Sequence, residues 1–219
     1  MILEANELYR FYHSAVSETA ALRGVSLAVR PGEMIAVMGP SGSGKSTLLS
    51  CLAGLDEPDG GHVNIAGERL TRRTEAERAK FRARHIGILL QAGNLFEHLT
   101  VGDNIRLQMR LARRPEGRTV RELLGAMGIS GREGAVPGEL SGGETARAGL
   151  AVALAAAPDV LLADEPTAEV DLVTEEAIID ILAGRSANGG ATLVVTHSAA
   201  VARRADRVLH LRDGKIVDA

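Results

Sequence analysis

Hydrophobic residues along the chain follow two patterns: short apolar runs bounded by turn residues, and stretches with apolar residues at helical spacing. The runs are typical of buried strands and the stretches of helices packed on one face. The expected strands are 34–38, 62–66, 86–90, 160–163 and 191–196, with short alternating strand-like segments over 2–30 and a C-terminal hairpin of 207–212 and 215–217. The expected helices are 45–53, 74–84, 101–113, 119–127, 143–157, 172–185 and 198–204. This alternation predicts an α/β fold with a mostly parallel sheet that binds ligands at the carboxyl ends of its strands.

The middle of the chain lacks strand signals between residues 91 and 157. A length of 219 residues fits one domain, or one domain with an inserted subdomain. We therefore predict a single domain over 1–219, in which 1–90 and 157–219 form an α/β core. Residues 91–156 are expected to form an inserted helical subdomain.

Composition narrows the range of partners and compartments. The net charge of −3 and an aromatic content of 2% disfavour a nucleic-acid binder, so no nucleic-acid partner is expected. The single cysteine, Cys51, excludes an internal disulfide and fits a reducing compartment. The N-terminal segment has no apolar core typical of a signal peptide, and the longest apolar run, 148–158, is too short to span a bilayer. A soluble, cytoplasmic protein is expected.

A glycine-rich loop follows the predicted strand 34–38 and matches the pattern G-x-x-x-x-G-K-[ST]. Its glycines let backbone N–H groups surround phosphate oxygens, Lys45 supplies a positive charge, and the hydroxyl of Ser46 can bind Mg²⁺. The helix that begins at the loop adds positive potential. The predicted nucleotide-binding residues are Gly39, Pro40, Ser41, Gly42, Ser43, Gly44, Lys45, Ser46 and Thr47.

Two acidic residues end the apolar run 160–163. An acid at the carboxyl end of a strand can reach Mg²⁺ in a phosphate-loop enzyme, and adjacent residues of an extended chain point in different directions. We therefore predict that Asp164 binds the metal and that Glu165 acts as general base on the attacking water. The alternative is that both acids belong to a turn or cap before Pro166.

A second candidate anion site begins the predicted helix 143–157, with Ser141, Gly142, Gly143 and Glu144. A serine followed three residues later by glutamate is also an ordinary capping box, and the two interpretations are compatible. Two phosphate-binding helix starts in one chain are unusual, unless the second serves a neighbouring molecule.

The complete set of motifs resembles the ATP-binding subunit of ABC transporters, over essentially the whole chain. The segments follow the family's order: phosphate loop 39–46, Gln91, signature 140–144, acidic strand 160–164, catalytic Glu165, Asp171 and switch histidine His197. Segments 39–61 and 94–105 are most similar to the lipoprotein-releasing and macrolide-efflux branch. The resemblance implies a P-loop NTPase core of the RecA-like type with an N-terminal antiparallel β subdomain and an inserted helical subdomain.

The resemblance also implies roles for four further residues. Gln91 would contact Mg²⁺ or the attacking water, and His197 would reach the γ-phosphate. Tyr12 would stack on adenine, and Asp171 would cross a dimer interface. The alternatives are a solvated loop amide for Gln91, a structural role for His197, core packing for Tyr12 and a helix N-cap for Asp171.

Three features depart from the family pattern. Glu144 stands where glutamine is usual, which places a negative charge near the start of the signature helix. Glu169-Val170 replaces a more familiar Asn-Leu pair, and the helix after the signature keeps Arg147 but lacks a second arginine at 151–154. We expect the chain still to bind nucleotide, but with a signature helix whose activity differs from that of typical family members.

These features predict an Mg²⁺-dependent ATPase that forms a head-to-tail homodimer with ATP and drives separate transmembrane permease subunits. The resemblance implies a position on the cytoplasmic face of the cell membrane and favours export or extraction. Residues 91–114 could form the groove that receives a partner's helix, or pack within the helical subdomain. The alternative functions are a non-transport ABC ATPase of DNA repair or translation, a small-molecule kinase and a non-hydrolysing regulatory module.

Overall fold

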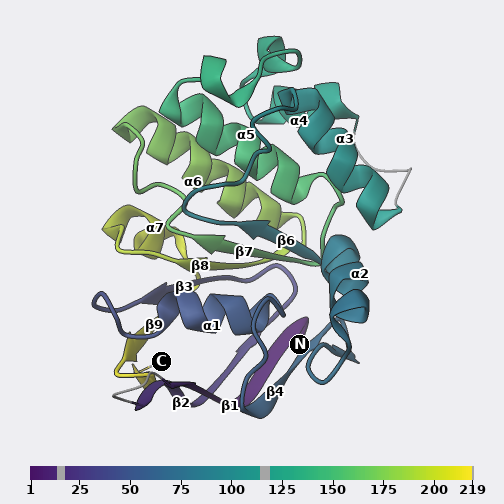
Figure 1. Ribbon diagram of the computed structural model, residues 1–219. Coiled ribbons are helices and arrows are strands. Elements are labelled where there is room, and N and C mark those ends of the chain that lie inside the picture. Colours follow the sequence, from purple (N-terminus) through teal and green to yellow (C-terminus); the bar gives the residue numbers. More distant parts are fainter. Residues whose placement is uncertain (14–17, 114–118, 219) are drawn as a thin grey trace.

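The computed structural model describes residues 1–13, 18–113 and 119–218. Two sheets lie in separate layers, with helix α1 (Lys45–Leu52) between them and a helical layer beyond the second sheet (Figure 1). The predicted α/β fold class is confirmed.

The larger sheet has six strands in the order β10-β9-β3-β8-β7-β6. Strands β9, β3, β8, β7 and β6 pair in parallel, and β10 pairs antiparallel with β9. Their bounds are β3 Met34–Met38, β6 Ile86–Leu89, β7 Val160–Asp164, β8 Ala191–Val195, β9 Arg207–Arg212 and β10 Lys215–Asp218. All five residues of β8 are buried, as expected for a strand covered on both faces.

The smaller sheet is antiparallel, in the order β2-β1-β4-β5. Its strands are β1 Leu3–His13, β2 Glu18–Val29, β4 Gly60–Ile65 and β5 Glu68–Arg69. The prediction of several short segments over 2–30 was wrong, because β1 and β2 are two long strands whose register shifts interrupt the alternation. Strand β5 was not predicted, since two polar residues carry no hydrophobic alternation.

Helices occupy the remaining positions close to those expected. Their bounds are α2 Glu75–His85, α3 Val101–Ala112, α4 Val120–Ala126, α5 Gly142–Leu154, α6 Leu172–Ala187 and α7 Ala199–Arg204, with short 3₁₀ turns at η1 Ser130–Arg132 and η2 Pro137–Glu139. Within the described parts of 91–156 every regular element is helical. Helix α5 ends before the predicted residue 157.

Two hydrophobic clusters hold these layers together. The first joins the smaller sheet, α1 and one face of the parallel sheet, and the second joins the opposite face to α3–α6. Alternation along β7 serves both clusters, because Leu162 belongs to the first and Leu161 to the second. Cys51 on α1 is buried in the first cluster, and this burial raises the pKa of its thiol to about 12. None of the helices in the described ranges combines the length and apolar character needed to cross a membrane.

We expect Leu162→Ala to lower the free energy of unfolding by about 2–5 kcal/mol, because it opens a cavity beneath a central strand. Leu162 is fully buried, whereas Leu172 is 82% exposed. The matched variant Leu172→Ala should therefore change stability by less than about 0.5 kcal/mol. Urea unfolding of both variants measures the difference, and equal losses would contradict this account of the core.

Candidate active site

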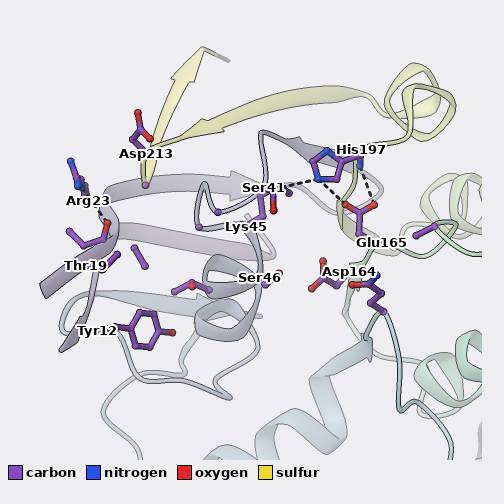
Figure 2. A pocket seen from close by; sticks show the side chains of 18 of the residues that line it. Tyr12, Thr19, Arg23, Ser41, Lys45, Ser46, Asp164, Glu165, His197 and Asp213 are labelled. Carbon is purple, nitrogen blue, oxygen red and sulfur yellow. Dashed lines mark hydrogen bonds and ion pairs between the residues drawn. The ribbon is translucent and has the colours of Figure 1, made fainter. Parts of the chain in front are cut away.

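A pocket of about 960 Å³ lies at the carboxyl ends of β3, β7 and β8. Among the described residues, seven separate stretches of the sequence line it, including β2, the glycine-rich loop and the segments after β7 and β8. Figure 2 shows these side chains converging from separate strands and loops. The position agrees with the rule that open parallel sheets bind ligands at the carboxyl edge.

The glycine-rich loop between β3 and α1 needs glycine for two different physical reasons. Gly44 has φ 103°, a left-handed conformation that side chains disfavour, and a Cβ there would lie 2.3 Å from the Ala21 carbonyl oxygen. Gly39 has no such backbone requirement, but its Cβ would lie 2.1 Å from the Leu211 carbonyl oxygen. The loop is thus pressed between β2 and β9. The side chain of Ser43 is buried, and its Oγ has no hydrogen-bond partner among the described residues.

Lys45 is a nearly buried cation at the floor of the pocket, with 8% of its surface exposed. Its Nζ donates to the carbonyl oxygens of Gly39 at 2.8 Å and Pro40 at 3.0 Å, and lies 3.3 Å from Nε2 of His197. Among the described residues, no carboxylate forms an ion pair with Lys45. A buried ammonium that forms no direct ion pair within the described residues makes this position suited to an anion such as phosphate.

Asp164 ends β7 and faces the first turn of α1. Its carboxylate is hydrogen-bonded to the hydroxyl of Ser46, and burial together with the neighbouring charge of Glu165 raises its pKa above the ordinary value, against the effect of that hydrogen bond. Carboxylate and hydroxyl oxygens are ligands that Mg²⁺ accepts. In the part of the chain that the structure describes, no group of three or more His, Cys, Asp or Glu side chains could hold a metal alone.

Glu165 turns away from Asp164 toward the segment after β8. One carboxylate oxygen accepts a hydrogen bond from the backbone N–H of His197 at 3.1 Å, and the other lies 3.6 Å from its Nε2. The φ of Glu165 is 48°, a strained left-handed conformation for a residue with a side chain. Figure 2 shows Lys45, His197 and Glu165 pointing toward one another.

Gln91 and Tyr12 also line the pocket, from opposite parts of the chain. The hydroxyl of Tyr12 donates to Oδ2 of Asp56 at 2.9 Å, and the guanidinium of Arg10 lies 4.8 Å from its ring centre. These contacts hold the Tyr12 ring at the rim, away from Lys45 (Figure 2). The nearby aromatic residues of β1 do not line the pocket but stack on each other.

The residues predicted as a second anion site lie elsewhere. Ser141 is the N-cap of α5. Its Oγ accepts from the backbone N–H of Glu144 at 3.3 Å, and the Glu144 carboxylate accepts from the backbone N–H of Ser141 at 3.0 Å. The predicted capping box is therefore present. Neither residue lines the pocket. Figure 1 shows that α1, α5 and α6 all begin on the side of the molecule where β7 ends.

Asp171 caps α6, and a hydrogen bond joins the first turn of α6 to α5. Oδ1 of Asp171 accepts from the backbone N–H of Val173 and Thr174, both at 3.0 Å, and Oδ2 accepts from the Thr174 hydroxyl at 2.8 Å. Arg147 of α5 donates to the same hydroxyl at 3.3 Å. A Cβ on Gly143 would lie 2.8 Å from this oxygen, so the close contact of α5 with α6 requires glycine there.

The structure thus separates the predicted site residues into three groups. The lining of the pocket contains Tyr12, Ser41, Gly42, Gly44, Lys45, Ser46, Thr47, Gln91, Asp164, Glu165 and His197. Gly39, Pro40 and Ser43 support the loop, whereas residues 141–144 and Asp171 lie outside the pocket.

Several lining residues were not predicted: Thr19, Ala20, Ala21, Arg23, Thr167, Ala168, Ser198, Asp213 and Gly214. Asp213 and Gly214 were recognised only as a hairpin turn. The β2 residues carry no motif, and packing against the loop alone brings them to the pocket.

A family model described as ABC transporter matches residues 22–168. The chain therefore belongs to the ABC transporter family, as an ATP-binding protein, and the resemblance inferred from the sequence is confirmed.

Individual relatives agree with this assignment. The chain is 38% identical to the lipoprotein-releasing system ATP-binding protein LolD of Acinetobacter baylyi, over 100% of this chain and 98% of the relative. It is 40% identical to the macrolide export ATP-binding/permease protein MacB of Rhodopirellula baltica, over 96% of this chain but 32% of that longer protein. Among solved structures, a dimeric ATP-binding cassette in a post-hydrolysis state with ADP and Pi aligns at a TM-score of 0.92 and 32% identity, covering 99% of this chain and 97% of the other.

The two signature glycines should respond differently to substitution. Gly143→Ala places a methyl group against Thr174, so we expect a loss of about 1–3 kcal/mol in the free energy of unfolding. Within the described residues, a Cβ on Gly142 would meet the Glu169 carbonyl oxygen alone, at 3.7 Å. Gly142→Ala should therefore change stability by less than about 1 kcal/mol. Denaturant unfolding tests this, and a greater loss for Gly142→Ala would refute the packing argument.

Proposed function

We propose that this chain hydrolyses ATP as the motor subunit of an ABC transporter, in a head-to-tail homodimer. One observation carries the proposal: the pocket holds the glycine-rich loop and both acids, but the helix start at 141–144, predicted as a second anion site, lies outside it. A twofold arrangement that sets residues 141–144 of one copy opposite the phosphate loop of the other completes two identical sites. The solved structure of a dimeric cassette with ADP and Pi supports this arrangement.

The phosphates of ATP are bound by the backbone N–H groups of the glycine-rich loop, by the start of α1 and by Lys45. The Lys45 ammonium exchanges its carbonyl contacts for phosphate oxygens. Tyr12 stacks on the adenine ring. Ser46, Asp164 and Gln91 hold Mg²⁺, which neutralises charge on the phosphates when it is bound.

Glu165 is the general base of hydrolysis. Its carboxylate accepts a proton from a water molecule as the water oxygen bonds to the γ-phosphorus and the bond to the ADP oxygen breaks, so that ADP and phosphate result. The backbone N–H of His197 orients the carboxylate, and the His197 ring lies between Glu165 and Lys45, where the γ-phosphate is expected.

The partner copy contributes the hydroxyl of Ser141 and the N–H groups of Gly142 and Gly143 to the γ-phosphate. Hydrolysis removes this contact and opens the dimer. Leu172 and Val173 are 82% and 81% exposed beside Asp171, which supports coverage of this face by a second copy. Asp171 then lies at the interface while it also caps α6.

Coupling to a membrane protein requires a second surface. A groove of about 230 Å³ lies between α2, α3, α5 and β6, and its lining includes Arg82, Gln108 and Leu111. Leu111 is 58% exposed, and we assign this groove to a helix of a transmembrane permease subunit on the cytoplasmic face of the membrane. The names of the relatives, a lipoprotein-releasing system and a macrolide exporter, support export or extraction as the direction of transport.

We expect Glu165→Gln to bind ATP while hydrolysing it at least about 100-fold more slowly, because glutamine cannot accept the proton. Glu169→Gln, in the same loop with an exposed side chain, is the matched control and should retain the rate. Phosphate release under steady-state conditions and equilibrium binding of fluorescent ATP separate the two effects. A near-normal rate for Glu165→Gln would remove Glu165 from this role.

We expect Glu165→Gln to be a monomer without nucleotide and a dimer with ATP, because ATP is retained and bridges the two copies. Light scattering after size-exclusion chromatography measures the mass. Ser141→Arg blocks the phosphate contact and should abolish dimerisation. Ser141→Asp keeps a side-chain oxygen that can cap α5, but its negative charge repels phosphate. This variant should also abolish dimerisation, without loss of the cap. A dimer that persists in both Ser141 variants would overturn the proposed sandwich.

A further inference from the structure

An ion pair joins the 3₁₀ turn η1 to the start of α5. Nε of Arg132 donates to Oε1 of Glu144 at 2.7 Å, and the other carboxylate oxygen accepts the backbone N–H of Ser141 at 3.0 Å. Both oxygens of Glu144 are therefore engaged, and its side chain is 18% exposed. The pair lies at the helix start that the proposed dimer sets against the γ-phosphate of the other copy.

The charge of Glu144 opposes the function of this helix start. Its hydrogen bond from the Ser141 N–H, with that from Arg132, holds the pKa of the carboxyl below its ordinary value, so the group is ionised at neutral pH. A carboxylate in the first turn stabilises the helix but repels an incoming phosphate. The N–H groups and hydroxyl at 141–143 can attract the phosphate only if that repulsion is offset.

Arg132 is placed to offset this repulsion. Glu133, next to Arg132 in the chain, is paired with Arg106, which also contacts Asp103. Among the ion pairs of the described residues, the cation that contacts Glu144 is Arg132. Arg132 is 45% exposed at its side chain and lies 12 residues before Glu144, so tertiary packing brings the two together.

We propose that Arg132 is a positioning residue for the ATP held by the partner copy. It cancels the charge of Glu144 and keeps that carboxylate turned onto the Ser141 N–H, so that the hydroxyl of Ser141 and the amides of Gly142 and Gly143 receive the γ-phosphate. The inference rests on the proposed function, because the phosphate at α5 belongs to a second copy of this chain.

A double-mutant cycle in the Glu165→Gln protein tests the inference. The readout is the ATP concentration at which half of the protein is dimeric, measured by analytical ultracentrifugation. Arg132→Gln alone should raise that concentration about threefold to tenfold, because an uncompensated carboxylate then faces the phosphate. In a protein that also carries Glu144→Gln, the Arg132→Gln substitution should change this ATP concentration less than twofold.

Two controls separate charge from structure. Arg132→Lys keeps the positive charge and should restore most of the loss. The penalty of Arg132→Gln should also shrink as salt rises, because ions screen exposed charges. Equal losses in the Glu144 and Glu144→Gln backgrounds would assign Arg132 a merely structural role and overturn the inference while leaving the proposed function intact. Failure of the Glu165→Gln protein to dimerise at saturating ATP would overturn both.

Discussion

The side chains that line the main pocket meet because β3, β8 and β7 pair in parallel with their ends aligned. Val195 of β8 stands beside Val37 of β3 on one side and beside Asp164 of β7 on the other. The residues that follow these positions are the glycine-rich loop, Glu165 and His197. Since a one-residue slip of a strand turns every side chain to the opposite face, the buried apolar residues that set this register also set the site. Both hydrophobic clusters contribute, because they cover opposite faces of the same strands.

The site built on this edge holds a positive charge with few compensating groups. Lys45 is nearly buried against backbone carbonyls, and Ser43 Oγ is buried with no hydrogen-bond partner in the part of the chain that the structure describes. Such groups lower stability in the folded chain unless an anion or other ligand satisfies them. The strained backbone of Glu165 is a further cost at the same place. The packing of the hydrophobic core offsets the loss in the free energy of unfolding that these groups cause.

The second helix start has the opposite character, since its polar groups are largely satisfied within the chain. Ser141 and Glu144 cap α5, Asp171 caps α6, and Thr174 joins the two helices through Arg147. A rigid, capped helix start is a suitable surface for an ion that arrives from another molecule. Glu144 stands where the family usually has glutamine. The ion pair with Arg132 compensates its negative charge. No contact in the structure explains the missing second arginine at 151–154.

The amino-acid sequence by itself determined the local parts of this protein. The strand, glycine loop and helix around Lys45, the paired acids 164 and 165 and the caps at Ser141 and Asp171 depend on residues close together in the chain, so their spacing predicts them. Tertiary structure alone decided which of these parts share a pocket. It placed Thr19 and Arg23 of β2 at the pocket beside the glycine-rich loop, Arg132 against Glu144 and Thr174 against Gly143. The physical reason is that such contacts arise from the packing of whole elements, and no pattern within a single element records them.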